Sequence, residues 1–376
     1  MVSLDIFAAE KLEAAAARSL LRHLPDPAAG GLNFCSNDYL GLSRDPRLMD
    51  AARQALQLHG TGAGASRLVT GNHGAYVDCE LAVADLKAAE AALVFGSGYL
   101  ANIGTIPALV GPGDMIVADA LSHACMMSGA RLSGAQVHVF RHNDTSHLGA
   151  LLAQHRPSFR HCLVMTEGVF SMDGDLAPLA AIAREARAHD AWLMTDDAHG
   201  LGVVGGGRGS AHAAGVVPDI QMGTFSKAVG SYGGYVAASR TVVDMLVNRA
   251  RSLVFSTGLP PAVVAASTAG LRIIADDPAL CARPVGLAQL FCETVGLPAP
   301  SSAIVPVVLG DADRALAASQ MLGAEGFLVR AIRPPTVPDG TSRLRVTFTA
   351  NQREDDVVRL AHAVRSRLPR RGELTA

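Results

Sequence analysis

The sequence predicts an α/β fold in which a large, doubly wound and mostly parallel sheet is joined to a smaller α+β domain. Short apolar runs alternate with helical patterns from about residue 75, as in strands joined by crossover helices. Ligands of such sheets bind where the strands end. The expected strands span 91–95, 115–118, 137–140, 162–166, 192–195, 220–225 and 234–238, and the helices between them include 75–89, 148–155 and 176–188.

The order of these patterns divides the chain into an N-terminal arm (1–45), a large domain (46–258) and a small domain (259–376). The Ala-rich part of the arm predicts an amphipathic helix, followed by Pro25 and Pro27. A helix after Pro260 and Pro261 opens the small domain. The expected helices of the arm and small domain span 10–21, 261–276, 311–322 and 352–368, and the strands span 303–309, 327–332 and 343–349.

Composition excludes several classes of protein. The 376 residues are 49% hydrophobic and 18% charged with a net charge of −2, and no long run of one sign occurs, so we expect neither nucleic acid nor a membrane surface as a partner. No signal peptide and no apolar run of about 18 residues is seen. Six cysteines form no C-x-x-C pair and no metal spacing. We therefore expect a reduced, cytoplasmic protein without a metal site.

One lysine stands out in a chain that otherwise uses arginine. Of 32 Lys and Arg residues only Lys11, Lys87 and Lys227 are lysines. The first two lie in ordinary helical patterns, whereas Lys227 lies in the small-residue segment GTFSKAVGSYGG (223–234). A desolvated lysine can lose its proton and attack a carbonyl, which arginine cannot. We expect Schiff-base chemistry at Lys227; a solvent-facing loop lysine is the alternative.

A second polar group follows the expected strand at 192–195. The run TDDAHG places Asp196, Asp197 and His199 at its carboxyl end. A lysine for the aldehyde and a carboxylate for the ring nitrogen are what pyridoxal phosphate requires. We expect Asp196 to bond the ring nitrogen, His199 to reach the ring hydroxyl, and Asp197 to point away as a structural residue. A helix N-cap is the alternative for Asp196, and a satisfied core histidine for His199.

A glycine-rich turn after the strand at 91–95 is the candidate phosphate site. Ser97, Gly98 and Tyr99 begin a helix there, so that backbone N–H groups and the helix dipole would face the phosphate. The glycine spacing also resembles, loosely, a dinucleotide fingerprint. That alternative would leave Lys227 unexplained.

Two further strands end in polar residues. His123 follows the strand at 115–118 and could stack on the cofactor ring, with helix capping as the alternative. Ser171 and Glu167 follow the strand at 162–166. Ser171 could bond the ring hydroxyl and Glu167 could face the substrate, although either could cap the next helix.

In this order the motifs resemble the α-oxoamine synthases, pyridoxal phosphate enzymes with the aspartate aminotransferase fold (fold type I). The resemblance covers nearly the whole chain. It rests on SNDYLGL (36–42), SRLVTGNH (66–73), the segments 166–175, 196–200 and 223–234, and IRPPTVPDGT (332–341).

The resemblance implies a role for each matching residue. Lys227 would hold the cofactor aldehyde, Asp196 the ring nitrogen and His123 the ring face, with Ser171 and His199 at the ring hydroxyl. Ser256 and Thr257 match a segment that reaches the partner subunit's phosphate, which implies a homodimer with shared sites. The matching phosphate-binding positions are Ser97, Gly98, Tyr99 and Thr224.

Substrate residues follow from the same resemblance. Arg345 matches the arginine that clamps the amino-acid carboxylate, for which bidentate geometry is the physical reason. Arg343 is the alternative and is expected on the opposite face of its strand. Asn37, Glu167 and Arg22 are further candidates for substrate contact.

The members that the chain most resembles condense L-alanine with pimeloyl-coenzyme A, or with pimeloyl carried on acyl carrier protein, in biotin biosynthesis. Glycine-using sister synthases (2-amino-3-ketobutyrate coenzyme A ligase, 5-aminolevulinate synthase), an aminotransferase or aldolase of the same fold, and a non-catalytic subunit of a larger synthase are the alternatives. Between 274 and 301 the chain looks roughly ten residues shorter than this family, so residues that grip the acyl chain or coenzyme A cannot be assigned there.

Overall fold

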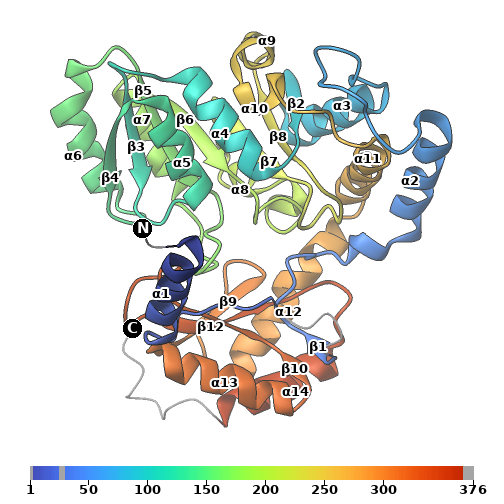
Figure 1. Ribbon diagram of the computed structural model, residues 1–376, viewed down its shortest axis with the longest axis vertical. Helices are drawn as coiled ribbons and strands as arrows, with labels where there is room; N and C mark the ends of the chain where they lie inside the picture. The colour runs from blue at the N-terminus through green and yellow to red at the C-terminus, as the bar shows by residue number, and fades with distance from the viewer. Residues whose placement is uncertain (1–2, 25–29, 367–376) are drawn as a thin grey trace. The chain divides into compact units, whose positions relative to one another are not determined.

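The computed structural model describes residues 3–24 and 30–366 (Figure 1). They form two compact units, a large one of residues 37–286 and 349–351 and a small one drawn from 1–36, 287–348 and the residues after 351. The expected domains, 46–258 and 259–376, and the arm, 1–45, do not coincide with these units. The reason is helix α11 (Pro261–Asp276), which packs against α2 (Pro46–His59) and α3 (Ala75–Lys87) and so belongs to the large unit.

A seven-stranded sheet forms the centre of the large unit. Its order is β2-β8-β7-β6-β5-β3-β4, and neighbours are parallel except that β8 is antiparallel to both β2 and β7. The mostly parallel α/β sheet that the sequence predicts is confirmed. The strands are β2 (Ala91–Phe95), β3 (Met115–Asp119), β4 (Gln136–Phe140), β5 (Cys162–Glu167), β6 (Trp192–Asp196), β7 (Ile220–Thr224) and β8 (Gly234–Ala238).

The sheet is buried on both faces, which explains why its strands read as continuous apolar runs. In β3, Ile116 and Ala118 belong to one hydrophobic core, whereas Met115 and Val117 belong to another. Side chains from α4, α5 and α9 fill the first core, and side chains from α6 and α7 fill the second. The further helices of this unit are α4 (Gly98–Leu109), α5 (Ala124–Ser133), α6 (Thr145–His155), α7 (Leu179–Ala188), α8 (Ser210–Ala213), α9 (Arg240–Arg249) and α10 (Arg251–Val254), with short 3-10 helices η1 (Leu42–Arg44), η2 (Arg156–Ser158) and η3 (Gly205–Gly207).

The small unit has the expected α+β character. β12 (Ser342–Thr347) lies between β11 (Arg330–Ile332) and β9 (Ile304–Gly310), antiparallel to both. β1 (Leu32–Asn33) pairs in parallel with β10 (Phe327–Leu328). Helices α13 (Ala312–Ala324) and α14 (Glu354–Arg365) match two expected helices, although residue 368, the expected end of the second, lies outside the described residues. Helix α12 (Pro278–Val295) fills most of the segment that appeared shortened, and the sequence analysis did not identify it.

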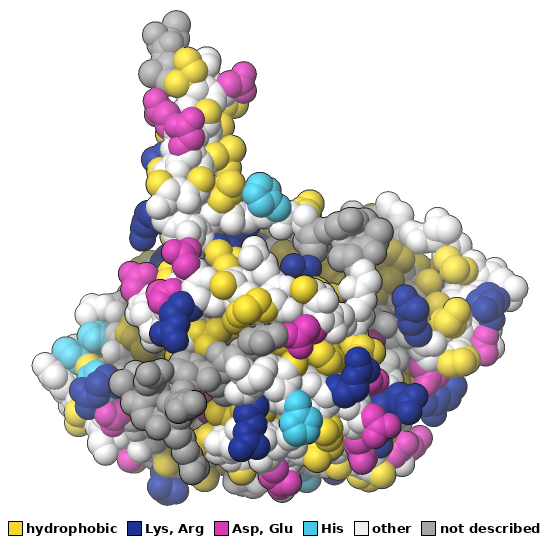
Figure 2. Space-filling view, turned by 90° about the horizontal axis from the view of Figure 1, so that it is seen from below, with side chains coloured by type: hydrophobic (Ala, Val, Ile, Leu, Met, Phe, Trp, Pro, Cys, Tyr) yellow, Lys and Arg dark blue, Asp and Glu magenta, His cyan; other side chains and the backbone are white. Residues whose placement is uncertain are grey.

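The helix of the arm differs from the expectation. α1 spans Leu4–Ala16 rather than 10–21, because the Ser3 hydroxyl accepts from the backbone N–H of Ile6 and caps its first turn. None of its residues is buried, so it is not an amphipathic helix with a covered face. Figure 2 shows hydrophobic and acidic side chains along α1. Pro25 and Pro27 lie outside the described residues, and no helix within them is long and apolar enough to span a membrane.

Candidate active site

The expected polar residues meet at one edge of the sheet. β5 ends at Glu167 and β6 at Asp196, and these two are directly paired in the parallel register. The neighbouring strand β7 is parallel to β6 and ends at Thr224, three residues before Lys227. Because parallel strands end at a common edge, the fold places these side chains in one neighbourhood.

Two donors hold the Asp196 carboxylate. Oδ2 accepts from Nδ2 of Asn102 at 2.8 Å, and Oδ1 accepts from the backbone N–H of Ala198 at 3.0 Å. Asn102 lies on α4 and is completely buried. Residues 198–203 form turns, so Asp196 does not cap a helix. It is a buried carboxylate with a fixed orientation, as the binding of a pyridinium nitrogen requires.

Asp197 takes part in a separate buried network. Nζ of Lys87 donates to Oδ2 of Asp197 at 2.9 Å, and both side chains are only 1% exposed. Ser210 donates to the same carboxylate through its backbone N–H and its hydroxyl. A Cβ atom at Gly209 would lie 1.7 Å from Oδ2, so the network leaves no room for a side chain there. These contacts agree with a structural role for Asp197. Lys87 lies in α3, as its helical pattern predicts, and its amine is buried in this network.

Lys227 lies at one end of a chain of hydrogen bonds. Its Nζ atom is 2.8 Å from Nε2 of His199, and Nδ1 of His199 is 2.6 Å from the hydroxyl of Tyr39. That hydroxyl donates to Oδ1 of Asn37 at 3.2 Å. When Nε2 accepts a hydrogen bond from the lysine amine, the proton of the neutral ring is on Nδ1, which donates to the Tyr39 oxygen. The arrangement can therefore orient the lysine amine and move a proton to or from it.

His123 is both a helix cap and a neighbour of the charged groups. Its Nδ1 accepts from the backbone N–H of Cys125 at 3.2 Å at the start of α5, so the capping alternative is present. Burial and the charge of Lys227 lower the pKa of His123, while the Asp196 carboxylate acts in the opposite direction. His123 nevertheless keeps part of its surface exposed, so capping leaves the residue accessible to a ligand.

Glu167 is buried close to the same charges. Burial and the Asp196 carboxylate raise the pKa of Glu167 well above its usual range, although Lys227 opposes the shift. Its Oε2 accepts from the backbone N–H of Ser171 at 3.3 Å. Glu167 thus joins the end of β5 to the loop that carries Ser171, which is itself buried.

The turn after β2 fits a phosphate group. Ser97 caps α4 by accepting from the backbone N–H of Leu100 at 3.1 Å, and Gly98 is the first helical residue. A Cβ atom at Gly98 would lie 3.0 Å from the Met222 side chain and 3.3 Å from that of Thr224. The free N–H groups of a helix's first turn bind anions, and the glycine lets the backbone approach closely. Tyr99 is half exposed, and its hydroxyl donates to Ser128 at 3.4 Å.

The contacts described do not join Ser256 or Thr257 to Lys227 and the residues hydrogen-bonded with it. Both follow α10; the Ser256 N–H donates to the Leu253 carbonyl, and Thr257 forms an isolated bridge with Ser66. Phe255 beside them is 71% exposed.

Two candidate substrate residues belong to the small unit. Arg345 on β12 is buried and lies opposite Arg330 of β11 in the strand register. Arg343, two residues earlier on β12, is also buried. Residues two apart on a strand share a face, so our expectation of opposite faces for Arg343 and Arg345 was wrong. Arg22 donates to the Thr336 hydroxyl at 3.1 Å.

Three residues of the site were not identified from the sequence. Tyr39 lies in the motif SNDYLGL and Asn102 lies shortly after the glycine-rich turn, but nothing in one sequence says that they contact His199 and Asp196. Lys87 is the third. Its signal was the rarity of lysine, the observation that identified Lys227. Within the described residues, no group of three or more His, Cys, Asp or Glu side chains is arranged to hold a metal ion.

Comparison with known proteins agrees with this geometry. The family described as aminotransferase class I and II matches residues 29–364. The 8-amino-7-oxononanoate synthase of Maricaulis maris is 54% identical over 97% of this chain and 96% of its own, and that of Methylocella silvestris is 55% identical over 89% and 96%. A serine palmitoyltransferase of S. paucimobilis, solved with bound pyridoxal phosphate and myriocin, has a TM-score of 0.89 and 29% identity over 98% of both chains.

Asp196, Lys227 and the α4 turn are groups of the kinds that pyridoxal phosphate binding requires. The family match and these relatives show that the chain belongs to the aminotransferase class I and II family, among its pyridoxal phosphate-dependent acyltransferases of fold type I.

Proposed function

We propose that the protein condenses L-alanine with a pimeloyl thioester, of coenzyme A or of acyl carrier protein, to give 8-amino-7-oxononanoate, carbon dioxide and the free thiol. The observation that carries the proposal is the pairing of Lys227 with His199 beside the oriented Asp196 carboxylate, in a chain 54–55% identical to relatives of that name. This step belongs to biotin biosynthesis, for which we propose a cytoplasmic location.

Pyridoxal phosphate, when bound, supplies the aldehyde that takes up the amino group and the ring that withdraws electrons from the amino-acid Cα. Asp196 keeps the ring nitrogen protonated, and Asn102 holds Asp196 in place for that contact. His123 stacks on the ring, and Ser171 and His199 bond its hydroxyl. Ser97, Gly98, Tyr99 and Thr224 bind the phosphate.

Lys227 would hold the cofactor through its aldehyde, and its amine would be the base that removes the Cα proton of alanine. His199 and Tyr39 would orient the amine for this transfer. The deprotonated Cα attacks the thioester carbonyl, and the thiol leaves. His123 is positioned to act on that carbonyl. Loss of the alanine carboxylate as carbon dioxide and return of a proton to Cα complete the product.

Substrate binding and assembly follow from the remaining residues. Arg345 clamps the alanine carboxylate, with Arg343 on the same strand face as its competitor for that role. Asn37, Glu167 and Arg22 contact substrate. Ser256 and Thr257 have no described contact with Lys227 and the residues hydrogen-bonded with it. They bind the cofactor phosphate in a partner subunit, so that the working unit is a homodimer.

Release of free thiol across a small panel tests the proposal. L-alanine, glycine and L-serine would each be combined with pimeloyl-, acetyl-, succinyl- and palmitoyl-coenzyme A. We expect the highest kcat/KM for alanine with pimeloyl-coenzyme A. Preference for glycine with a short acyl group would identify a sister synthase, and preference for serine with palmitoyl would follow the solved relative instead. Release of no thiol with any pair would favour a non-catalytic subunit, against which Lys227 argues.

A further inference from the structure

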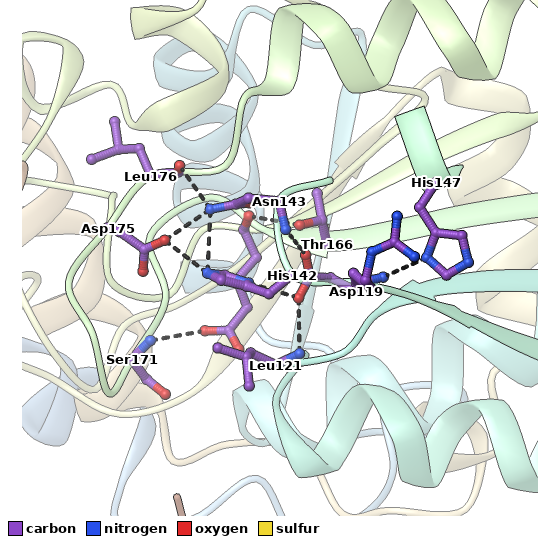
Figure 3. Close-up of polar contacts among 11 residues, drawn as sticks. Asp119, Leu121, His142, Asn143, His147, Thr166, Ser171, Asp175 and Leu176 are labelled. Carbon is purple, nitrogen blue, oxygen red and sulfur yellow. Dashed lines mark hydrogen bonds and ion pairs between the residues drawn. The ribbon is translucent and has the colours of Figure 1, made fainter. Parts of the chain in front are cut away.

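A histidine outside the site described above joins two of the segments that carry it. His142 follows β4, and its ring lies between two carboxylates (Figure 3). Nδ1 is 2.9 Å from Oδ1 of Asp119, and Nε2 is 2.8 Å from Oδ2 of Asp175. The Asp119 side chain is completely buried, whereas those of His142 and Asp175 are 28% and 37% exposed.

Each carboxylate lies four residues along the chain from a residue of the proposed site. Asp119 is the last residue of β3, four residues before His123, and it also accepts from the backbone N–H of Leu121 at 2.8 Å. Asp175 lies in the loop after β5, four residues after Ser171. His142 therefore connects the turn that leads to His123 with the loop that carries Ser171.

The loop from 168 to 177 has other contacts besides this one. Val169 and Leu176 form an isolated bridge, the backbone N–H of Phe170 donates to the Asp175 carbonyl, and the backbone N–H of Ser171 donates to Glu167. The ring of Phe170 meets that of His142 edge-on at 4.4 Å. Asn143 donates through Nδ2 to Asp175 at 2.8 Å and through its backbone N–H to Asp119 at 2.8 Å, and so reinforces the same connection.

The geometry determines the charge of the ring. A carboxylate only accepts hydrogen bonds, so both nitrogens of His142 must carry protons to satisfy Asp119 and Asp175 together. The ring is then a cation that bonds two anions, and such charge-assisted bonds are the strong ones. The flanking Arg141 does not compete, because it pairs with Asp144 at 2.7 Å. Burial alone would lower the pKa of His142, but the bonds to Asp119 and Asp175 outweigh it and raise the pKa to about 10.

We propose that His142 is a positioning residue, an imidazolium that ties Asp119 to Asp175. It thereby holds the His123 turn and the Ser171 loop at the spacing that contact with the face and the hydroxyl of the cofactor ring requires. The inference rests on the ring-binding roles proposed above for His123 and Ser171. It assigns His142 no contact with substrate or cofactor.

The test compares His142→Gln with His138→Gln. His138 is also half-buried and lies on β4. Its ring packs at a tilt against that of His155, with the centroids 4.3 Å apart, instead of contacting Asp119 or Asp175. Hydrogen exchange measured by mass spectrometry on the holoenzyme should rise about fivefold or more in peptides covering 119–125 and 168–177 of His142→Gln. Exchange in α11 should stay unchanged, and His138→Gln should resemble the wild type throughout.

A second variant keeps the test decisive if His142→Gln does not fold. Asp175→Asn removes one carboxylate and leaves the bond from His142 to Asp119, so exchange should rise at 168–177 and not at 119–125. In both variants kcat should fall by about tenfold while the KM for the amino acid changes less than about threefold. The visible absorption of the bound cofactor should change in His142→Gln, because Ser171 and His123 shift around its ring.

Two results for His142→Gln would overturn the proposal. Exchange at the wild-type rate in both peptides would mean that the bridge does not hold either segment. An equal rise of exchange in every peptide would mean that the bridge only stabilises the fold. Exchange and absorption need no substrate. They test the bridge even if the alanine condensation proves to be the wrong reaction.

Discussion

The Nζ atom of Lys87 lies 2.9 Å from a carboxylate oxygen of Asp197, and both side chains are almost completely buried. Asp196, the preceding residue, accepts instead from Asn102. Successive side chains at the end of β6 therefore point into different surroundings, as alternation along a strand requires. Asp197 belongs to the ion pair with Lys87, and Asp196 is the carboxylate that we propose for the ring nitrogen of the cofactor.

Substitution of each aspartate should separate these roles. Asp197→Asn leaves the buried Lys87 charge without its partner, so the free energy of unfolding should fall by about 3–5 kcal/mol. Asp196→Asn should alter stability much less, yet lose most turnover because an amide cannot keep the ring nitrogen protonated. Chemical denaturation and steady-state kinetics measure the two effects. Equal loss of turnover in two variants of equal stability would show that the assignment of Asp196 is wrong.

The cofactor should be found on one lysine. Purified protein should be yellow, and borohydride should fix the cofactor on the peptide that contains Lys227, because Lys87 is buried in an ion pair and Lys11 lies on the exposed helix α1. Peptide mass spectrometry identifies the site. Lys227→Ala should fold and bind the cofactor without that covalent link, with turnover lower by about 10²–10⁴-fold or more. Labelling of Lys11 or Lys87 would contradict the assignment.

Arg345 tests how the amino acid is held. A desolvated guanidinium–carboxylate pair contributes about 2–5 kcal/mol, so Arg345→Ala should raise the apparent constant for alanine by well over about tenfold. The constant for the acyl thioester should change far less. Arg343→Ala is the matched control, since it removes a buried arginine from the same face of β12. The opposite pattern, with alanine spared and the thioester affected, would place Arg345 on the acyl side.

The stability of the protein should depend on pH through His142. Its pKa is about 10 in the folded protein and near 6.5 when unfolded, so its stabilising contribution is complete below about pH 6.5 and is lost as the pH rises to about 10. The difference in unfolding free energy between the wild type and His142→Gln should therefore shrink across this range. Denaturation at intervals from pH 6 to 10 measures it. A constant difference would mean that His142 keeps the same charge state in the folded and unfolded chain.

The sheet could be predicted closely from sequence because its strands are short apolar runs buried on both faces. β2 and β8 were placed with their observed bounds, 91–95 and 234–238. Helices were less visible. α12 carries Pro284 in its interior and was not identified, whereas α3 was expected at 75–89 and spans Ala75–Lys87.

The site was predictable to the extent that chemistry demands particular residue types at strand ends. Lys227, Asp196, His199 and Glu167 were found in this way, and they lie in one neighbourhood. Asn102 and Tyr39 were missed because their roles depend on contacts between segments 94 and 160 residues apart, and amide and phenol groups are common in loops for other reasons. His142 was missed for the same reason, since its two partners come from the end of β3 and from the loop after β5.

The central claim is that the alanine Cα forms the new carbon–carbon bond while its carboxylate is lost. Reaction of the wild type with pimeloyl-coenzyme A and L-alanine carrying ¹³C in every carbon, followed by mass spectrometry of the product and of the released gas, tests it directly. We predict 8-amino-7-oxononanoate that keeps the alanine Cα and methyl labels, with labelled carbon dioxide and free coenzyme A released in equal amounts. Labelled pyruvate formed without release of coenzyme A, or a product that retains the carboxyl label, would contradict the account.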